Sequence, residues 1–305
     1  MRVLVIGYGS MGSRHTRVLT NLGCKVSVLS KRVVEFEPCY DNLKIALKEE
    51  QPDYVVITNK TVEHYSTLLE LSRLGYKGIV LVEKPLFHTL LQINVDQFKA
   101  VFVAYNMRFN PLIQKLRNFL KKEKVLSVQA YVGQYLPSWR PERDYRLSYS
   151  ANKVEGGGVL RDLSHELDFI TWIFGGWSSV TALGGHFSHL EIDSDDIFSI
   201  MGVTTECPIV TVQLNYLDRV THREILINTE QHVVEVDFLQ QTISIDDQVE
   251  KFDVERDLTY RLQHQAVLKE DYKYLCSIDD GIEVLKLIDA IESSACFKKR
   301  IWVDI

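Results

Sequence analysis

The sequence predicts an α/β protein of two domains, an N-terminal doubly wound parallel sheet followed by an α+β domain with a mostly antiparallel sheet. The chain has 305 residues, more than one hydrophobic core usually supports. Short continuous apolar runs alternate with helical patterns over about the first hundred residues, as in parallel sheets buried on both faces. Beyond residue 180 the runs are β-branched and partly alternating, which is typical of antiparallel sheets.

Composition and charge exclude several classes of protein. Hydrophobic residues make up 46% of the chain and charged residues 25%, which indicates a globular protein. A net charge of −6 predicts no broad attraction to nucleic acid or to anionic membranes. The five cysteines are scattered without a CxxC pair, as in proteins of a reducing compartment. No apolar run is long enough to span a bilayer and no leader precedes the first strand, so we expect a cytoplasmic protein.

The chain opens with a strand, a glycine-rich turn and a helix. Residues 2–6 are apolar, and a helical pattern continues to about residue 22. The turn between them reads Gly7-Tyr8-Gly9-Ser10-Met11-Gly12. In this order GxGxxG is the dinucleotide-binding fingerprint, because its glycines allow a tight turn, a close approach to pyrophosphate and close helix packing. We therefore predict a Rossmann domain whose turn holds a dinucleotide at the helix N-terminus.

The residues after the second strand, 25–29, bear on the choice of cofactor. An NAD site usually has an acidic residue there to hold the ribose 2′-hydroxyl. This chain has Ser30-Lys31-Arg32 instead. A hydroxyl followed by two cations suits a 2′-phosphate, so we predict NADP in preference to NAD. The alternative is that Lys31 and Arg32 are ordinary exposed loop charges.

Further buried strands are predicted over residues 53–57, 79–82 and 100–103, and the second of them ends at Glu83-Lys84-Pro85. Open α/β sheets bind their ligands at the carboxyl ends of their strands. Lys84 can hold a substrate oxygen there by its charge, or take part in proton transfer. A surface lysine at a strand end is the alternative.

Residues 156–168 combine three glycines with a helical pattern. The helix has an apolar stripe made of Leu163, Leu167, Ile170 and Phe174. Asp162, His165 and Asp168 lie on the other side, and such a face can bind or deprotonate a polar ligand. The alternative is an amphipathic helix with a solvated polar face. Later helices are expected over 263–276 and 281–295.

A long loop before the glycines concentrates aromatic rings and guanidinium groups. Aromatic faces suit sugar rings, and forked guanidinium donors suit phosphates or carboxylates. The candidate substrate-binding residues of this region are Tyr135, Trp139, Arg140, Tyr145, Arg146 and Tyr149. A mobile surface loop is the alternative. The cluster His186, His189, Asp193, Asp195 and Asp196 matches no metal-ligand spacing, so we predict no metal site.

With these motifs in hand, the whole chain resembles the Gfo/Idh/MocA family, the relatives of glucose–fructose oxidoreductase and inositol dehydrogenase. The resemblance rests on GxGxxG, Glu83-Lys84-Pro85 and the glycine loop before Asp162 and His165. It implies an NAD(P)-binding Rossmann domain, placed over residues 1–104, and a substrate-binding domain over 105–305. It also implies hydride transfer with a sugar, cyclitol or related polyol, and a homodimer or homotetramer formed through the open face of the second sheet.

By position, Lys84 resembles the family's catalytic lysine and His165 its acid/base histidine. Asp162 resembles the aspartate that assists the histidine. The family usually separates these two residues by four positions, whereas here they are three apart, so Asp168 is an alternative partner for His165. Other residues that the resemblance places at the cofactor or substrate are Thr58, Asn59, Glu83, Asn106 and Arg108; Thr58-Asn59 stands where Thr-Pro is usual.

The segment from Leu136 to Ser150 looks like a subgroup associated with bacterial surface-glycan genes, which implies a sugar or nucleotide-activated sugar as substrate. Two alternatives remain open at this point. One is a non-catalytic dinucleotide sensor of the co-repressor type, which needs no lysine–histidine pair. The other is a dehydrogenase of a non-sugar substrate such as a trans-dihydrodiol.

Overall fold

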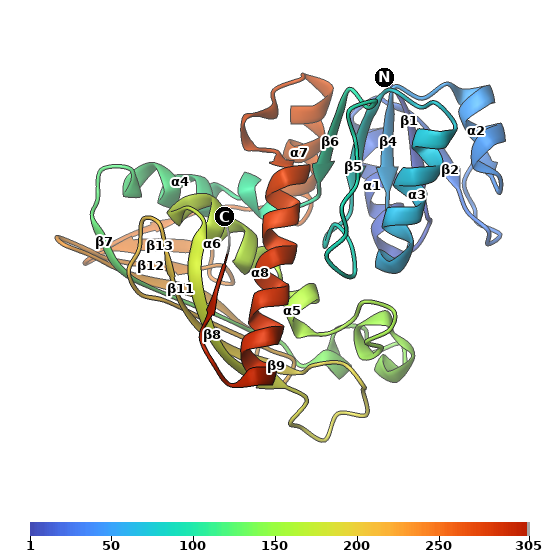
Figure 1. Cartoon of the computed structure of the whole chain (residues 1–305). Helices are drawn as coiled ribbons and strands as arrows, with labels where there is room; N and C mark the ends of the chain where they lie inside the picture. The colour runs from blue at the N-terminus through green and yellow to red at the C-terminus, as the bar shows by residue number, and fades with distance from the viewer. Residues whose placement is uncertain (304–305) are drawn as a thin grey trace. The chain divides into compact units, whose positions relative to one another are not determined.

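A computed structural model describes residues 1–303, and this part of the chain forms two compact units (Figure 1). The first unit comprises residues 1–109 and 255–282, and the second comprises residues 110–254 and 283–303. The sequence-based division after residue 104 placed residues 255–282 in the second domain. In the structure they pack with the first unit, because α7 (Leu258–Leu268) lies against α1 (Ser10–Asn21).

The first unit is built on a seven-stranded sheet in the order β15-β6-β5-β4-β1-β2-β3. All neighbours pair in parallel except β15, which is antiparallel to β6. The strands are β1 (Arg2–Ile6), β2 (Lys25–Leu29), β3 (Cys39–Tyr40), β4 (Tyr54–Ile57), β5 (Ile79–Val82), β6 (Ala100–Val103) and β15 (Cys276–Ser277). The central strands β4 and β5 are buried along their whole length, which explains their unbroken apolar sequences.

Helices surround this sheet in Figure 1. They are α1, α2 (Leu43–Glu50), α3 (Thr61–Arg73), α7 and the first turns of α8 (Ile278–Phe297), with the 3₁₀ segments η1 (Asn106–Phe109) and η5 (Tyr272–Tyr274). Val267 from α7 and Leu275 from the following turn join the same apolar core as Val5 and Leu81. The strand–turn–helix order at the N-terminus and the parallel sheet confirm the predicted Rossmann architecture.

The predicted helix over residues 263–276 is wrong in both bounds. Helix α7 ends at Leu268, and Glu270 adopts a left-handed backbone with φ of 56°. Beyond it Asp271 caps the 3₁₀ turn η5, and Cys276 pairs with Val103 at the edge of the sheet. Pairing with β6 satisfies backbone groups that a longer helix would bond internally. The periodicity of residues 263–276 could not predict this ending, because the partner strand is distant in the sequence.

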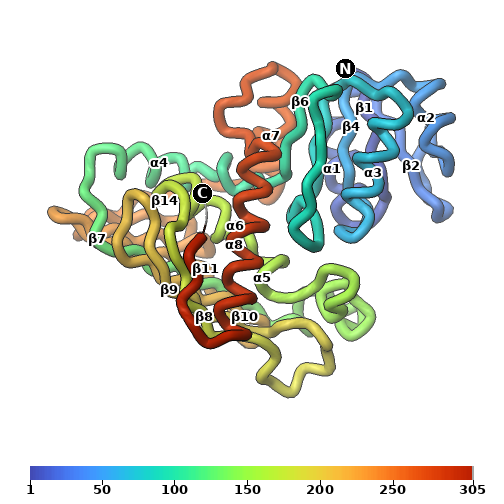
Figure 2. Tube along the Cα trace, in the orientation of Figure 1, coloured from blue at the N-terminus to red at the C-terminus, as the bar shows by residue number. Residues whose placement is uncertain are grey.

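The second unit contains a nine-stranded sheet in the order β14-β13-β12-β11-β7-β10-β9-β8-β16. Only the β7–β10 pair is parallel, so the sheet is mostly antiparallel, as predicted. Its strands are β7 (Val125–Gly133), β8 (Trp177–Gly185), β9 (Ile197–Thr204), β10 (Val210–Asn215), β11 (His222–Thr229), β12 (Val233–Asp237), β13 (Thr242–Ile245), β14 (Gln248–Lys251) and β16 (Ile301–Trp302). Figure 2 traces this sheet, in which β8, β9 and β10 are neighbours and β7 separates β10 from β11.

Helices cover one face of this sheet. They are α4 (Pro111–Leu120), α5 (Val159–Asp162), α6 (His165–Phe174) and the later turns of α8; η2 (Leu136–Ser138), η3 (Tyr145–Leu147) and η4 (Tyr149–Ala151) lie in the loop before α5. Helix α5 contacts β9 and β10, and Ser294 of α8 accepts the backbone N–H of Ala182 on β8 at 2.9 Å. On β9 Phe198 and Ile200 are buried while Ser199 and Met201 are exposed, so the opposite face is open. Within residues 1–303 no helix meets the length and apolarity that crossing a bilayer requires.

Candidate functional site

The glycine turn after β1 has the geometry that a bound dinucleotide requires. Gly7 has φ of 94°, and a Cβ there would lie 2.6 Å from the backbone nitrogen of Asn59. A Cβ at Gly12 would collide with the carbonyl oxygen of Gly7. At Gly9, by contrast, no described atom lies within 4 Å of a Cβ position. Two glycines are therefore needed for packing, and the third leaves open space beside the backbone.

Helix α1 begins immediately after this turn and presents a positive terminus. Gly9 is its N-cap, and among the described residues no side chain caps the terminus. The first turn reads Ser10-Met11-Gly12-Ser13 and carries no carboxylate. Its amide N–H groups and the helix dipole are therefore unneutralised by side chains. The turn and the helix together fit a pyrophosphate, and Thr58 braces them by donating its hydroxyl to Gly7 O at 2.7 Å.

The loop after β2 places two cations at the surface. Ser30 Oγ is 3.1 Å from both the backbone nitrogen and the carbonyl oxygen of Arg32, which closes a small turn. Lys31 and Arg32 are exposed. An NAD site usually has an acidic residue here, whereas this chain has the hydroxyl of Ser30 followed by the positive charges of Lys31 and Arg32.

Glu83 and Lys84 follow β5, at the carboxyl end of the sheet. The Glu83 carboxylate turns inward: Oε1 lies 2.7 Å from Nε2 of His15, and Oε2 accepts the backbone N–H of Lys84 at 3.0 Å. Burial raises the pKa of Glu83, but the hydrogen bond from His15 and the charge of Lys84 outweigh it, so that pKa is lowered. Glu83 is thus ionised and held inside the first unit.

Asn106 and Arg108, in η1, make contacts within the first unit. The Asn106 amide donates to the Thr259 hydroxyl at 2.7 Å, and Arg108 Nη1 donates to Asp280 at 2.9 Å. Both side chains are buried. They tie η1 to α7 and to the start of α8, a role that the sequence did not reveal.

In the second unit, Asp162 ends α5 and receives two tyrosine hydroxyls. Tyr149 donates to Oδ1 at 2.7 Å, and Tyr216 donates to Oδ2 at 2.6 Å. Burial, followed by the charge of Asp162, raises the pKa of both tyrosines well above the usual value. Both tyrosines therefore remain O–H donors that fix the carboxylate.

His165 begins α6, a separate helix from the one that carries Asp162. Leu163 and Ser164 interrupt the helix, and the Ser164 hydroxyl bonds back to the carbonyl oxygen of Arg161 at 2.9 Å. The single predicted helix is therefore wrong at this point, because Ser164 competes for backbone acceptors. The predicted apolar stripe is confirmed: Leu163, Leu167, Ile170 and Phe174 are all buried. The alternative of a solvated polar face fails, since Asp162, Glu166 and Asp168 are buried too.

Two of the three glycines before α5 are explained by close packing. A Cβ at Gly157 would meet the carbonyl oxygen of Tyr149, and a Cβ at Gly158, which has φ of 116°, would meet the carboxylate of Asp195. That carboxylate accepts the Leu160 N–H at 3.1 Å. Burial raises the pKa of Asp195 to about 6, against the lowering effect of that hydrogen bond. Asp195 thus orders the glycine loop, and its neighbour Asp196 accepts the backbone N–H groups of Phe187 and Ser188, in the loop after β8.

Comparison with known proteins agrees with both units. Residues 1–103 match the oxidoreductase family with an NAD-binding Rossmann fold, and residues 113–235 match the GFO/IDH/MocA C-terminal domain. The chain belongs to the Gfo/Idh/MocA oxidoreductase family. No protein of curated function matches the sequence. The predicted glycan-associated subgroup stays a prediction.

Solved structures of this family share the fold over the whole chain. Levoglucosan dehydrogenase in complex with NADH is 17% identical, with a TM-score of 0.84, and the match covers 100% of this chain and 99% of that one. The WlbA dehydrogenase from Bordetella pertussis, in complex with NADH and UDP-GlcNAcA, is 17% identical, with a TM-score of 0.81 and coverage of 100% and 98%. At these identities the likeness shows the fold.

The aromatic and basic loop of this Gfo/Idh/MocA chain is internally braced. Arg146 donates to both carboxylate oxygens of Asp144 at 2.7 to 3.0 Å and to Glu191 at 3.1 Å. The Arg146 guanidinium group is therefore bonded to acidic side chains of the protein itself. The side chain of Arg140, in the same loop, is exposed. Tyr145 contributes to the same brace, because its hydroxyl accepts the Glu191 N–H at 3.2 Å.

An aromatic side chain of that loop contacts Tyr216, one of the two tyrosines that donate to Asp162. The Trp139 ring meets the Tyr216 ring edge-on, with centroids 5.3 Å apart. Its indole N–H is buried and has no hydrogen-bond partner among the described residues. The Arg219 guanidinium stacks 3.7 Å from the centroid of the Tyr135 ring. Two residues organise this region: Tyr216, which sequence reasoning missed, and Asp195, which it considered only as a metal ligand.

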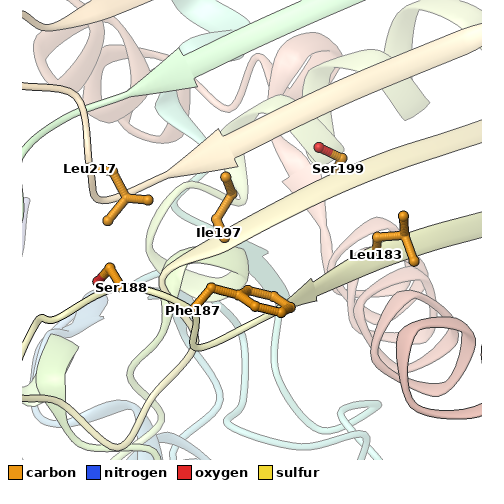
Figure 3. Close-up of a pocket in the computed structure, with 6 residues that line it drawn as sticks. All are labelled: Leu183, Phe187, Ser188, Ile197, Ser199 and Leu217. Atoms are coloured by element: carbon orange, nitrogen blue, oxygen red, sulfur yellow. The ribbon is translucent and has the colours of Figure 1, made fainter.

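A hollow of about 360 Å³ lies elsewhere in the second unit, near the ends of β8 and β9. Figure 3 shows the side chains around it: Leu183, Phe187, Ser188, Ile197, Ser199 and Leu217. None of the predicted site residues is among these six. Leu183 and Phe187 are 68% and 72% exposed, so the hollow belongs to the open face of the sheet.

Proposed function

We propose that the chain is an NAD(P)-dependent oxidoreductase that acts on a secondary hydroxyl, or the matching ketone, of a sugar or nucleotide-activated sugar. The observation that carries the proposal is the Asp162 carboxylate, fixed by Tyr149 and Tyr216 next to the helix that His165 begins. A buried, doubly hydrogen-bonded carboxylate three positions before a histidine in the chain suits proton transfer to and from a hydroxyl. The glycine turn in the first unit supports the cofactor class.

The nicotinamide, when bound, supplies the hydride acceptor or donor. His165 takes the hydroxyl proton during oxidation and returns it during reduction. Lys84, as an ammonium group, stabilises the negative charge that develops on the substrate oxygen. Asp162 orients His165 and stabilises its protonated form, while the two tyrosines keep the Asp162 carboxylate in place. Asp168 is the alternative partner for His165.

The substrate class follows from the loop before the glycines. We assign Arg140 to a phosphate or carboxylate of the substrate. Its side chain is exposed, and its positive charge acts on the Tyr149 hydroxyl by opposing the rise that burial causes in the pKa of that group. The unpartnered Trp139 N–H offers a donor for a sugar oxygen. Arg146 and Tyr145 brace the loop. The UDP-sugar bound to the WlbA dehydrogenase is consistent with an anionic sugar substrate.

For the cofactor we propose NADP in preference to NAD, held at its 2′-phosphate by Ser30, Lys31 and Arg32. The exposed side chains of Lys31 and Arg32 support this assignment. We also propose a homodimer or homotetramer that uses the open face of the second sheet.

The proposed activity is tested by incubating the purified protein with NADP⁺ or NAD⁺ and a panel of free and nucleotide-activated sugars. Formation of reduced nicotinamide with at least one sugar is expected, faster with uronic or nucleotide sugars than with neutral hexoses. Tight binding of NADPH or NADH without turnover of any sugar, cyclitol or dihydrodiol would favour a dinucleotide sensor.

A further inference from the structure

Four buried side chains of the first unit form a continuous hydrogen-bonded chain. Glu83 Oε1 lies 2.7 Å from Nε2 of His15, whose Nδ1 lies 2.7 Å from Nε2 of His264. The Nδ1 atom of His264 lies 3.0 Å from the Tyr54 hydroxyl. All four side chains are less than 10% exposed. They join the carboxyl end of β5 to α1, α7 and β4.

The positions of the protons on these four side chains follow from the number of hydrogen-bond donors and acceptors. The Tyr54 hydroxyl is fully buried, and His264 is its one hydrogen-bond partner within residues 1–303. A buried O–H must donate, so His264 Nδ1 accepts and its Nε2 carries the proton. That N–H donates to His15 Nδ1, and His15 Nε2–H donates to Glu83. Every donor therefore points from Tyr54 toward Glu83.

The opposite arrangement leaves a buried group unsatisfied. A doubly protonated His15 would donate to His264, which would then donate to the Tyr54 oxygen. The Tyr54 hydrogen would have no acceptor in the described interior, and an unsatisfied buried donor destabilises the fold. Burial lowers the pKa of His264 well below its usual value. The arrangement that satisfies every donor therefore places one proton on each imidazole and the negative charge on Glu83.

We propose that Tyr54, His264 and His15 form a relay that holds the Glu83 carboxylate in place for Lys84. In this arrangement Glu83 fixes the backbone of Lys84 through its N–H and keeps the Lys84 side chain in the ammonium form. Because His15 lies on α1, the relay also links Lys84 to the helix that receives the dinucleotide. The relay makes Glu83, His15 and His264 positioning residues, and its functional value rests on the proposed role of Lys84.

Other charged or titratable groups border the relay. Tyr260 meets the His15 ring edge-on at 5.5 Å, and Arg14 stacks on Tyr260 while pairing with Asp257 at 3.5 Å. Within residues 1–303, groups that act on the relay or on its immediate neighbours include Arg14, Cys24, His64, Tyr76, Lys84, Asp257 and Tyr260. Of the two cations in this set, Arg14 is engaged by Asp257, and Lys84 acts on Glu83 directly.

The relay is tested without any substrate by titrating Lys84 in the cofactor-free protein. Lysines are reductively ¹³C-methylated, and the Lys84 resonance is identified by its loss in Lys84→Arg. Glu83→Gln should shift the Lys84 titration to lower pH, because the neighbouring anion is gone. Tyr65→Phe is the matched control: it removes another tyrosine hydroxyl of the same unit, which donates to Gln92 O at 3.3 Å, and should leave the titration unchanged.

Two further variants keep the test decisive if Glu83→Gln does not fold. His264→Gln retains an acceptor for Tyr54 and a donor for His15, whereas His264→Leu removes both. In ¹⁵N-histidine spectra His15 should be a neutral Nε2–H tautomer in the wild type and in His264→Gln. In His264→Leu the His15 ring should change tautomer or gain a proton, and the Lys84 titration should shift to lower pH.

Turnover separates this inference from the proposed function. With an active sugar, Glu83→Gln should lower kcat about tenfold to a hundredfold by misplacing Lys84, and should move the alkaline limb of the pH profile to lower pH. A Lys84 titration that is the same in all variants overturns the relay, even if the enzyme oxidises sugars. A shifted titration without any turnover upholds the relay and leaves the sugar oxidoreductase proposal refuted.

Discussion

At the scale of single residues, Lys84 and His165 each provide one group to the proposed chemistry. Alanine at either position should lower turnover about 10²–10⁴-fold, because charge stabilisation or proton transfer is lost. NADPH binding should persist, since the glycine turn is untouched. Steady-state kinetics and a fluorescence titration measure the two effects separately.

Exposed residues of the same types provide the controls for that experiment. Lys77→Ala and His189→Ala replace a surface lysine of the first unit and a surface histidine of the second. Both should keep wild-type turnover. Near-normal rates in Lys84→Ala or His165→Ala would remove that residue from the mechanism.

Asp195 gives a prediction about pH and stability. Burial raises its pKa in the folded protein from 3.8 to about 6, so the folded state holds this proton more tightly than the unfolded state. The resulting stabilisation is complete below a pH of about 3.8 and is lost as the pH rises through about 6. Asp195→Asn should remove this loss while still accepting the Leu160 N–H.

Urea unfolding of wild type and Asp195→Asn over this pH range measures the difference. The free energy of unfolding of the wild type should fall relative to that of the variant as the pH rises. Asp193→Asn, an exposed carboxyl of the same loop, should track the wild type. Parallel pH curves for wild type and Asp195→Asn would contradict a titrating Asp195.

Sequence motifs indicated Lys84, Asp162 and His165 because each lies next to a local pattern of glycines or at a strand end. The partners that fix them were not predictable in this way. Tyr216 is 54 positions from Asp162, and His264 is 249 positions from His15. Only the folded chain brings such residues together, and no short pattern surrounds either one.

At the scale of elements, the loop after β2 carries the cofactor prediction. Replacing Lys31 and Arg32 together by alanine removes two cations from the proposed 2′-phosphate site. The Kd for NADPH should rise about tenfold to a hundredfold, as for the loss of charged hydrogen bonds, while the Kd for NADH changes little. Lys44→Ala, an exposed lysine of α2, is the control. Equal effects on both cofactors would refute the phosphate assignment.

The strands of the first sheet were predicted closely because burial on both faces leaves continuous apolar runs. β1, β2, β5 and β6 have the predicted bounds. Helix ends that depend on tertiary contacts were missed. Ser164 interrupts the helix between Asp162 and His165, and α7 ends at Leu268 where a turn leads to an edge strand.

At the scale of the whole molecule, the open face of the second sheet carries exposed apolar side chains, among them Leu183 and Met201 at 68% and 59% exposure. We propose that a second copy of the chain covers this face. Leu183→Glu with Met201→Glu should lower the molecular mass measured by light scattering after gel filtration. Leu90→Glu, an exposed leucine of the first unit, should not. A monomeric wild type would contradict the proposal.

The sequence predicted the two-domain architecture, since GxGxxG and the alternating strands each identify their domain. It did not predict that residues 255–282 return to the first unit. Helix α7 supplies His264 and Val267 to that unit, and its helical pattern is equally compatible with either domain. Which core a helix joins is decided by long-range packing.

Isotope transfer tests the central claim most directly. A sugar deuterated at the carbon bearing the oxidised hydroxyl is incubated with NADP⁺ and the enzyme, and the nicotinamide product is analysed by mass spectrometry. The proposed mechanism predicts direct transfer of deuterium to the nicotinamide by the wild type, and its near-absence in His165→Ala. Failure of the wild type to transfer deuterium from any sugar that it binds would contradict the account.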